Sequence, residues 1–259
     1  MSGLHRAVLL IGLTHMFHQA AFAGSEIPPA KVKLIDQGRA IHYRGYLDGP
    51  ANTQVAETIK SSGGRVSRLV IDSGGGDVNQ GMDLAEIVLA HQLDVEVERL
   101  CASSCANYVF PAAKNKVIQP GAVVVWHGSA IQEGLDEGPG LDDIVMADGS
   151  TLSLSEKREL LQRNKEQGVR YFTEARLRQA ALFKRIGVDE RVTVMGQQLN
   201  SAQEWTLTTA DMLRFGINNV SAPADYGVSL PADIRERGVR LLSLDHYPDY
   251  TLSLKRAYD

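Results

Sequence analysis

The chain has 259 residues, a formal net charge of −4, and 44% apolar against 22% charged residues. This composition is typical of a globular protein and excludes a largely disordered chain. Lysine and arginine form no cluster larger than pairs such as Lys157-Arg158 and Lys184-Arg185, so nucleic acid is not expected as a partner. Without its leader, the chain keeps about 236 residues, enough for one sizeable core.

The N-terminus reads as a targeting segment. A short basic region at His5-Arg6 precedes the apolar run Ala7–Leu13, and Ala21-Phe22-Ala23 offers a small-x-small cleavage pattern. We therefore expect a signal peptide over residues 1–23, cleaved after Ala23, and a periplasmic or secreted protein. An uncleaved membrane anchor and a cytosolic amphipathic start are the alternatives. No later run is apolar for long enough to span a bilayer, so stable membrane insertion is not expected after cleavage.

The first informative elements are a strand, a glycine turn and a helix. After the strand Ala40–Tyr46, Arg68–Asp72 reads as a short buried strand that runs into Ser73-Gly74-Gly75-Gly76. Asp77 is a candidate N-cap for the helix Gly81–Leu89, whose apolar residues recur at helical spacing. The glycines therefore lie at a strand-to-helix turn, where backbone N–H groups can approach a developing negative charge.

A second strand-to-helix turn follows and carries a serine. Asp94–Glu98 alternates like a strand, and Ala106–Phe110 is apolar enough for a buried helix, so Ser103 falls at a helix start. The strands Asn115–Gln119 and Ala122–Trp126 come next, around the turn Pro120-Gly121, and His127 ends the second of them.

Together these features supply an oxyanion cradle, a nucleophile and a base. A serine needs a neighbouring base to be deprotonated, and a histidine is that base near neutral pH. The pattern predicts a serine hydrolase with Ser103 and His127 in the catalytic pair.

Residues 66–220 resemble the proteolytic subunit of the Clp protease and its secreted relatives. That family has a Ser-x-Gly-Gly turn followed by a Gly-Met pair, as Ser73–Gly76 and Gly81-Met82 are here, and a histidine some two dozen residues after its serine. His127 lies 24 positions after Ser103. Secreted relatives often read Cys-x-Ser-x-Cys, which selects Ser103 over Ser104. The resemblance implies an α/β fold of the ClpP/crotonase type, with repeated ββα units and a long helix after the catalytic histidine.

The resemblance also implies further site residues. The oxyanion donors would be the backbone N–H groups of Gly76 and Ser104. Counting back from Gly216 in the segment Trp205–Ile217 puts Glu204 at the position of the family's acidic triad member. Asp189 and Asn200 are the alternatives for orienting the histidine.

The two cysteines, Cys101 and Cys105, bracket Ser103. In an oxidising compartment they would form a disulfide across the nucleophile turn, since one lies before the helix and the other one turn inside it. The alternative is two small buried thiols. No metal is expected, because the spacing is not Cys-x-x-Cys and no histidine pair completes a tetrahedral site. No cofactor is expected either.

Three regions lie outside the motifs. Residues 134–153 read as an acidic loop, either a surface excursion or a lid. Leu154–Ile186 has helical spacing and predicts one long or broken helix, the place where the family packs its subunits, so a homo-oligomer is expected by resemblance. Residues 222–259 form a C-terminal extension to the domain over residues 24–221, and could serve as an arm that covers a neighbour.

The sequence therefore predicts an exported serine peptidase that acts on peptides or unfolded protein, through Ser103, His127 and Glu204. A non-catalytic scaffold or binding module on the same fold is the stronger alternative. A crotonase-type acyl-thioester enzyme is the other, although an exported protein would lack a ready supply of coenzyme A.

Overall fold

The structure is a computed structural model that describes residues 28–135 and 152–256. The chain divides into two compact units. Among the described residues, 28–131 and 177–256 belong to the larger unit, and 132–135 and 152–176 belong to the smaller one. Every candidate site residue named above lies in the larger unit.

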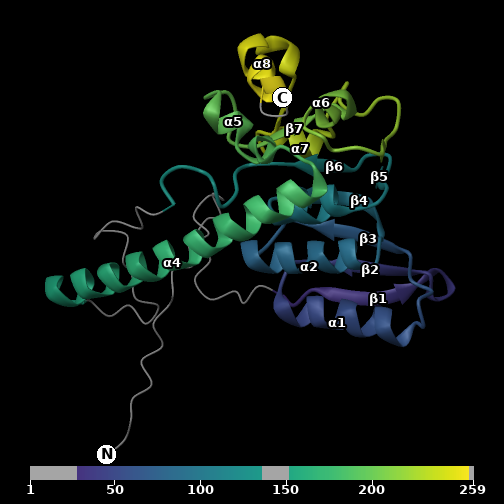
Figure 1. Cartoon of the computed structure of the whole chain (residues 1–259), viewed down its shortest axis with the longest axis horizontal. Helices are drawn as coiled ribbons and strands as arrows, with labels where there is room; N and C mark the ends of the chain where they lie inside the picture. The colour runs from purple at the N-terminus through teal and green to yellow at the C-terminus, as the bar shows by residue number, and fades with distance from the viewer. Residues whose placement is uncertain (1–27, 136–151, 257–259) are drawn as a thin grey trace, which may run out of the picture. The chain divides into compact units, whose positions relative to one another are not determined.

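The larger unit is built on a mostly parallel sheet. Seven strands take part, and their bounds are β1 (Lys31–Ile35), β2 (Ala40–Arg44), β3 (Arg68–Ser73), β4 (Asp94–Ala102), β5 (Lys116–Ile118), β6 (Val123–Val125) and β8 (Val220–Ser221). The order is β1-β2-β3-β4-β5-β8, with β6 also paired to β4, and only the β1–β2 pair is antiparallel. Parallel strands require crossover connections, and α1 (Gly49–Ser61) and α2 (Val78–Ala90) supply two of them. Figure 1 shows these two helices side by side against the sheet. The predicted α/β class is confirmed.

Strand β4 is the longest strand and is shared by two neighbours. Its first half pairs with β5, where Val95 faces Lys116, and its second half pairs with β6, where Ala102 faces Val125. The ends of β4 and β6 therefore lie side by side, and the segments that follow them leave the sheet at the same edge.

Local sequence signals account for the helix that follows the glycine turn. Asp77 is the N-cap of α2, and its carboxylate accepts the N–H of Gln80 at 2.9 Å, as predicted. The segment after β4 begins with a π-helical turn, η2 (Cys105–Val109), and continues as α3 (Phe110–Ala112). π-helical turns are rare and are found frequently at functional sites.

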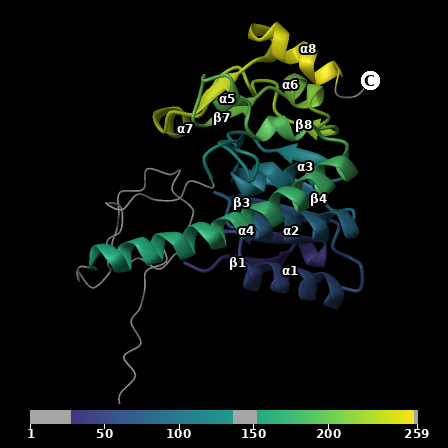
Figure 2. The same ribbon diagram turned by 60° about the vertical axis from the view of Figure 1, so that its left-hand side comes forward.

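The C-terminal segment is part of the larger unit. Short elements make up this part of the chain: η4 (Glu190–Thr193), α5 (Met195–Gln198), β7 (Trp205–Leu207), α6 (Thr209–Arg214), α7 (Ala232–Glu236), β9 (Arg240–Leu242), η5 (Leu244–His246) and α8 (Pro248–Arg256). Strand β9 pairs with β7, and Figure 2 shows the surrounding helices gathered beside them. Ile234 and Val239 share one buried cluster with Leu100 and Ala102 of β4 and with Val123 and Val125 of β6. Residues after 221 thus pack against the strands that lead to Ser103 and His127.

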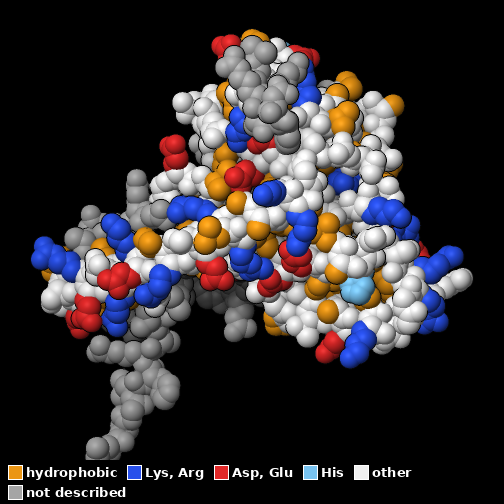
Figure 3. Space-filling model, in the orientation of Figure 1, with side chains coloured by type: hydrophobic (Ala, Val, Ile, Leu, Met, Phe, Trp, Pro, Cys, Tyr) orange, Lys and Arg blue, Asp and Glu red, His pale blue; other side chains and the backbone are white. Residues whose placement is uncertain are grey.

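The predicted long helix is one continuous helix, α4 (Leu154–Ile186). Residues 154–176 belong to the smaller unit and residues 177–186 to the larger one. Basic and acidic side chains are interspersed along the helix, and Figure 3 shows them mixed over its surface. Within residues 28–135 and 152–256, no helix is both long and apolar enough to cross a membrane. The predicted signal peptide and most of the acidic loop lie outside the described residues.

Candidate active site

Ser103 lies on the turn between β4 and η2. Its backbone φ is +56°, in the left-handed region that residues other than glycine seldom adopt. Its N–H donates to the carbonyl of Val125 at 3.0 Å, and its carbonyl accepts the N–H of Asn107 at 2.8 Å. The residue is thus held on both sides in a conformation that costs energy, and such residues cluster at functional sites.

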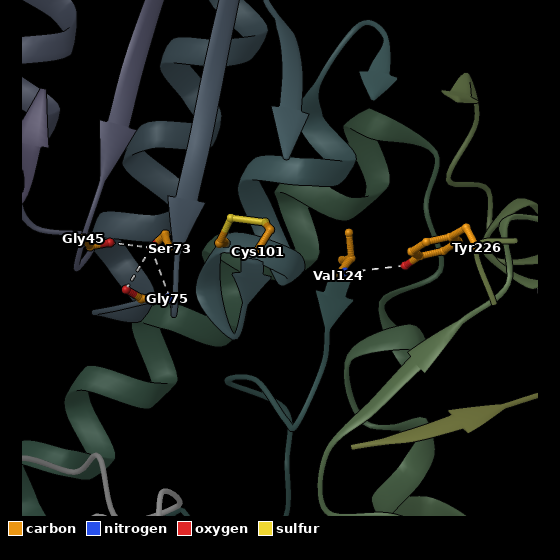
Figure 4. The surroundings of a disulfide bond; sticks show 7 residues. Gly45, Ser73, Gly75, Cys101, Val124 and Tyr226 are labelled. Carbon is orange, nitrogen blue, oxygen red and sulfur yellow. Dashed lines mark hydrogen bonds between the residues drawn. A yellow bond between two sulfur atoms is a disulfide. The ribbon is translucent and has the colours of Figure 1, made fainter. Parts of the chain in front are cut away.

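A disulfide between Cys101 and Cys105 closes a ring around Ser103. The two Cα atoms are 5.2 Å apart, within the range that a disulfide requires, and both cysteines are fully buried. Figure 4 shows the bond joining the end of β4 to the start of η2. Of the two interpretations of the cysteine pair, the structure has the disulfide.

The glycine turn lies directly against Ser103. Gly75 has a φ of +100°, and a Cβ atom at this position would lie 2.5 Å from the Cβ of Ser103 and 3.1 Å from its Oγ. Ser73 holds the turn, because its hydroxyl donates to the carbonyl of Gly45 at 2.6 Å and accepts the N–H of Gly75 at 3.1 Å (Figure 4). Only glycine fits at position 75 without moving the serine or the turn.

Gly76 and Ser104, the two residues expected to donate to an oxyanion, are in direct contact. The hydroxyl of Ser104 donates to the carbonyl of Gly76 at 2.8 Å, and Ser104 is 1% exposed. A Cβ atom at position 76 would lie 2.8 Å from the Cα of Leu47, so this glycine is also required by packing. The hydroxyl of Ser104 therefore joins the two turns.

His127 lies two residues after the end of β6, the strand that pairs with the end of β4 before Ser103. Its carbonyl accepts a hydrogen bond from Nε2 of Gln197 at 2.8 Å. Burial lowers the pKa of the imidazole from 6.5 to about 4, against a smaller opposing effect of a backbone hydrogen bond. The ring is therefore neutral at pH 7, which is the form that can accept a proton.

Glu204 is far from His127 in the sequence, but its backbone lies close to that of His127 in the fold. Trp126 and Trp205 form an antiparallel bridge, with N–H···O distances of 2.8 and 2.9 Å, so His127 and Glu204 flank the same bridge on neighbouring segments. One carboxylate oxygen of Glu204, Oε2, is buried and has no hydrogen-bond partner within the described residues. Burial raises the pKa of this carboxyl, and the charge of Arg237 opposes the rise. The structure thus brings the two backbones together, but the charge that acts on Glu204 is that of Arg237.

The two alternatives to Glu204 have other surroundings. The carboxylate of Asp189 accepts hydrogen bonds from the guanidinium of Arg191 at 2.9 and 3.1 Å and caps η4. Asn200 is exposed, with a φ of +49°, and its N–H donates to the carbonyl of Gln197. Both residues thus have a local structural role.

Two amide side chains at the site were missed by sequence reasoning. Asn107, inside η2, donates from Nδ2 to the carbonyl of Gly128 at 2.8 Å, and Gln197 donates to His127. The only signal for Asn107 was a polar residue inside the apolar run Ala106–Phe110, and nothing marked Gln197. No group of three or more residues able to hold a metal ion occurs in the part of the chain that the structure describes.

Comparisons with known proteins address the fold alone. No family model and no curated protein matches the sequence. Solved structures do match, among them a mutant of ClpP1 from Listeria monocytogenes, with a TM-score of 0.38 and 15% sequence identity. The match covers 73% of this chain and 94% of the ClpP1 chain.

Proposed function

We propose that this chain is a serine hydrolase, and that its substrates are peptides or unfolded protein. The observation that carries the proposal is the position of Ser103. It has a left-handed backbone, lies inside a disulfide ring, and rests against a glycine turn that could hold an oxyanion. His127, neutral at pH 7, lies two residues beyond the end of the neighbouring strand β6.

In the proposed reaction, Oγ of Ser103 attacks the carbonyl carbon of the scissile amide while His127 takes the hydroxyl proton. The N–H groups of Gly76 and Ser104 stabilise the negative charge on the carbonyl oxygen. The carbon–nitrogen bond then breaks, and His127 gives its proton to the leaving amine. Water attacks the acyl-enzyme, again through His127, and the ester bond to Ser103 breaks as the serine regains its proton.

Glu204 is proposed as the third member, which orients His127 and stabilises its protonated form. The proposal is supported by the Trp126–Trp205 bridge, which His127 and Glu204 flank, and by the buried oxygen Oε2, which has no hydrogen-bond partner among the residues that the structure describes. Asp189 is a weaker choice because Arg191 occupies its carboxylate.

We also propose that the protein acts after export, to the periplasm or the medium. The signal-like segment over residues 1–23 supports this location, and so does the disulfide, which forms and persists in oxidising compartments. A homo-oligomer is part of the proposal, because α4 carries largely exposed apolar side chains such as Leu177, which is 71% exposed.

Intact-mass labelling with a serine-directed fluorophosphonate tests the function. The mature protein should gain one adduct, and both Ser103→Ala and His127→Ala should abolish it. Glu204→Gln should slow labelling, whereas the exposed Glu236→Gln should not. A folded protein that gains no adduct would contradict hydrolysis and favour the scaffold or binding module.

A further inference from the structure

Asn107 connects the proposed nucleophile to the proposed base. Its backbone N–H donates to the carbonyl of Ser103 at 2.8 Å. Its side-chain Nδ2 donates to the carbonyl of Gly128, the residue after His127, also at 2.8 Å. One residue therefore contacts both chain segments whose separation decides whether a proton can pass between Ser103 and His127.

The side chain of Asn107 is expensive to bury. The residue is 2% exposed, and its Oδ1 has no hydrogen-bond partner within the described residues. A buried polar atom that lacks a partner carries a desolvation cost. A leucine has the same number of side-chain heavy atoms and would carry no such cost in this apolar segment. The gain from asparagine therefore has to come from the bond to Gly128, which is the one side-chain hydrogen bond that Asn107 makes among the described residues.

The segment that this bond holds has a second amide contact. Gly128 has a φ of +135°, and the preceding carbonyl, that of His127, accepts Nε2 of Gln197. Two side-chain amides, from η2 and α5, thus hold two successive carbonyls. His127, whose carbonyl takes one of these bonds, is itself partly buried.

We infer that Asn107 is a positioning residue, which ties the segment carrying His127 to the turn carrying Ser103 and so fixes the distance between base and nucleophile. This inference rests on the proposed function, and it adds a residue to the site. Asn107 acts on the reaction through the backbone of Gly128.

The chain offers a closely matched control in Asn52. This asparagine is also buried, at 5% exposure, and its Nδ2 donates to a backbone carbonyl, that of Gln80, at 2.8 Å. Its Oδ1 also lacks a partner within the described residues. Asn52 lies in α1, and its side-chain bonds reach only α2, so its loss should cost similar stability without affecting Ser103 or His127.

The experiment compares Asn107→Leu with Asn52→Leu, and uses Asn107→Ala with Asn52→Ala if the leucine variants do not fold. The first measurement is the rate of fluorophosphonate labelling at saturating reagent. We expect it to fall about 10- to 100-fold in the Asn107 variant, because a small misplacement of reacting groups costs that much. The Asn52 variant should label at the wild-type rate.

The second measurement does not depend on activity. Titration of the His127 ring followed by NMR should give a pKa of about 4 in the wild type. Release of the segment in the Asn107 variant would expose the ring to water and move the pKa toward 6.5, whereas the Asn52 variant should keep the wild-type value.

The two measurements separate the inference from the proposed function. Equal labelling rates in the two variants, with equal His127 titrations, would overturn the role of Asn107 while leaving the hydrolase intact. A wild type that is never labelled would overturn the hydrolase. In that case, a pKa shift confined to the Asn107 variant would still establish the connection to His127, and its absence would refute it.

Discussion

Replacing Gly75 by alanine tests whether the glycine turn and Ser103 form one site. The new Cβ would lie 2.5 Å from the Cβ of Ser103, whereas ordinary van der Waals contact begins at 3.4 Å. The turn and the serine must therefore separate by about 0.9 Å, a displacement that can cost about 100-fold in rate when it separates reacting groups. Ser103 cannot simply move aside, because its backbone is bonded to Val125 and Asn107.

A matched variant removes the effect of backbone strain. Gly75 has a φ of +100°, so alanine there also costs about 1–2 kcal/mol of stability. Gly238 has a φ of +87°, and a Cβ atom added there would meet no described residue within 4 Å other than its two chain neighbours, so Gly238→Ala carries the strain without the collision. Urea unfolding should show the strain cost alone in Gly238→Ala and a larger loss in Gly75→Ala, where the collision adds to the strain. Fluorophosphonate labelling should be slowed only by Gly75→Ala. Labelling rates within about twofold of each other would refute the contact between turn and nucleophile as a requirement of the site.

Two further predictions concern the base and the disulfide. The labelling rate should fall as the pH is lowered, with a midpoint near pH 4, because only neutral His127 accepts the serine proton and burial lowers its pKa to about 4. A midpoint near pH 6.5 would mean that the ring is solvated when the serine reacts. In the double variant Cys101→Ala, Cys105→Ala, the free energy of unfolding should fall by about 2 kcal/mol, the loss expected for so short a disulfide ring. The variant should also be labelled more slowly, because Ser103 can relax from its left-handed backbone conformation. Unchanged stability and an unchanged labelling rate in that variant would contradict the idea that the disulfide holds the turn at Ser103.

The elements that carry the site were predictable because their signals are local. Glycines at a strand end, an aspartate at the N-cap position and helical spacing of apolar residues are properties of a few consecutive residues. They gave β3, the cap at Asp77 and the bounds of α4 correctly. The β4 strand was predicted too short, at Asp94–Glu98, because Arg99 breaks the alternation before the buried residues Leu100 and Cys101 continue the strand.

The contacts that complete the site depend on residues far apart in the sequence. Asn107 and Gly128 are 21 positions apart, and Gln197 and His127 are 70 apart. Neither pair has a pattern that one sequence could reveal, because an amide bonded to a carbonyl requires no particular residue type at the carbonyl. The packing of Ile234 and Val239 behind β4 and β6 was missed for the same reason.

The electrostatics of the site indicate where transition-state stabilisation has to come from. A base with a pKa of about 4 accepts a proton reluctantly, so His127 alone gives little driving force for deprotonating Ser103. Glu204 would help only as a carboxylate, yet burial raises its pKa and Arg237 is the charge that opposes the rise. The backbone N–H groups of the glycine turn do not titrate, so their polarity is the same at every pH. If the chain is a hydrolase, the oxyanion side should therefore carry more of the catalysis than the acid, and displacing the turn at Gly75 should slow acylation more than removing the charge of Glu204.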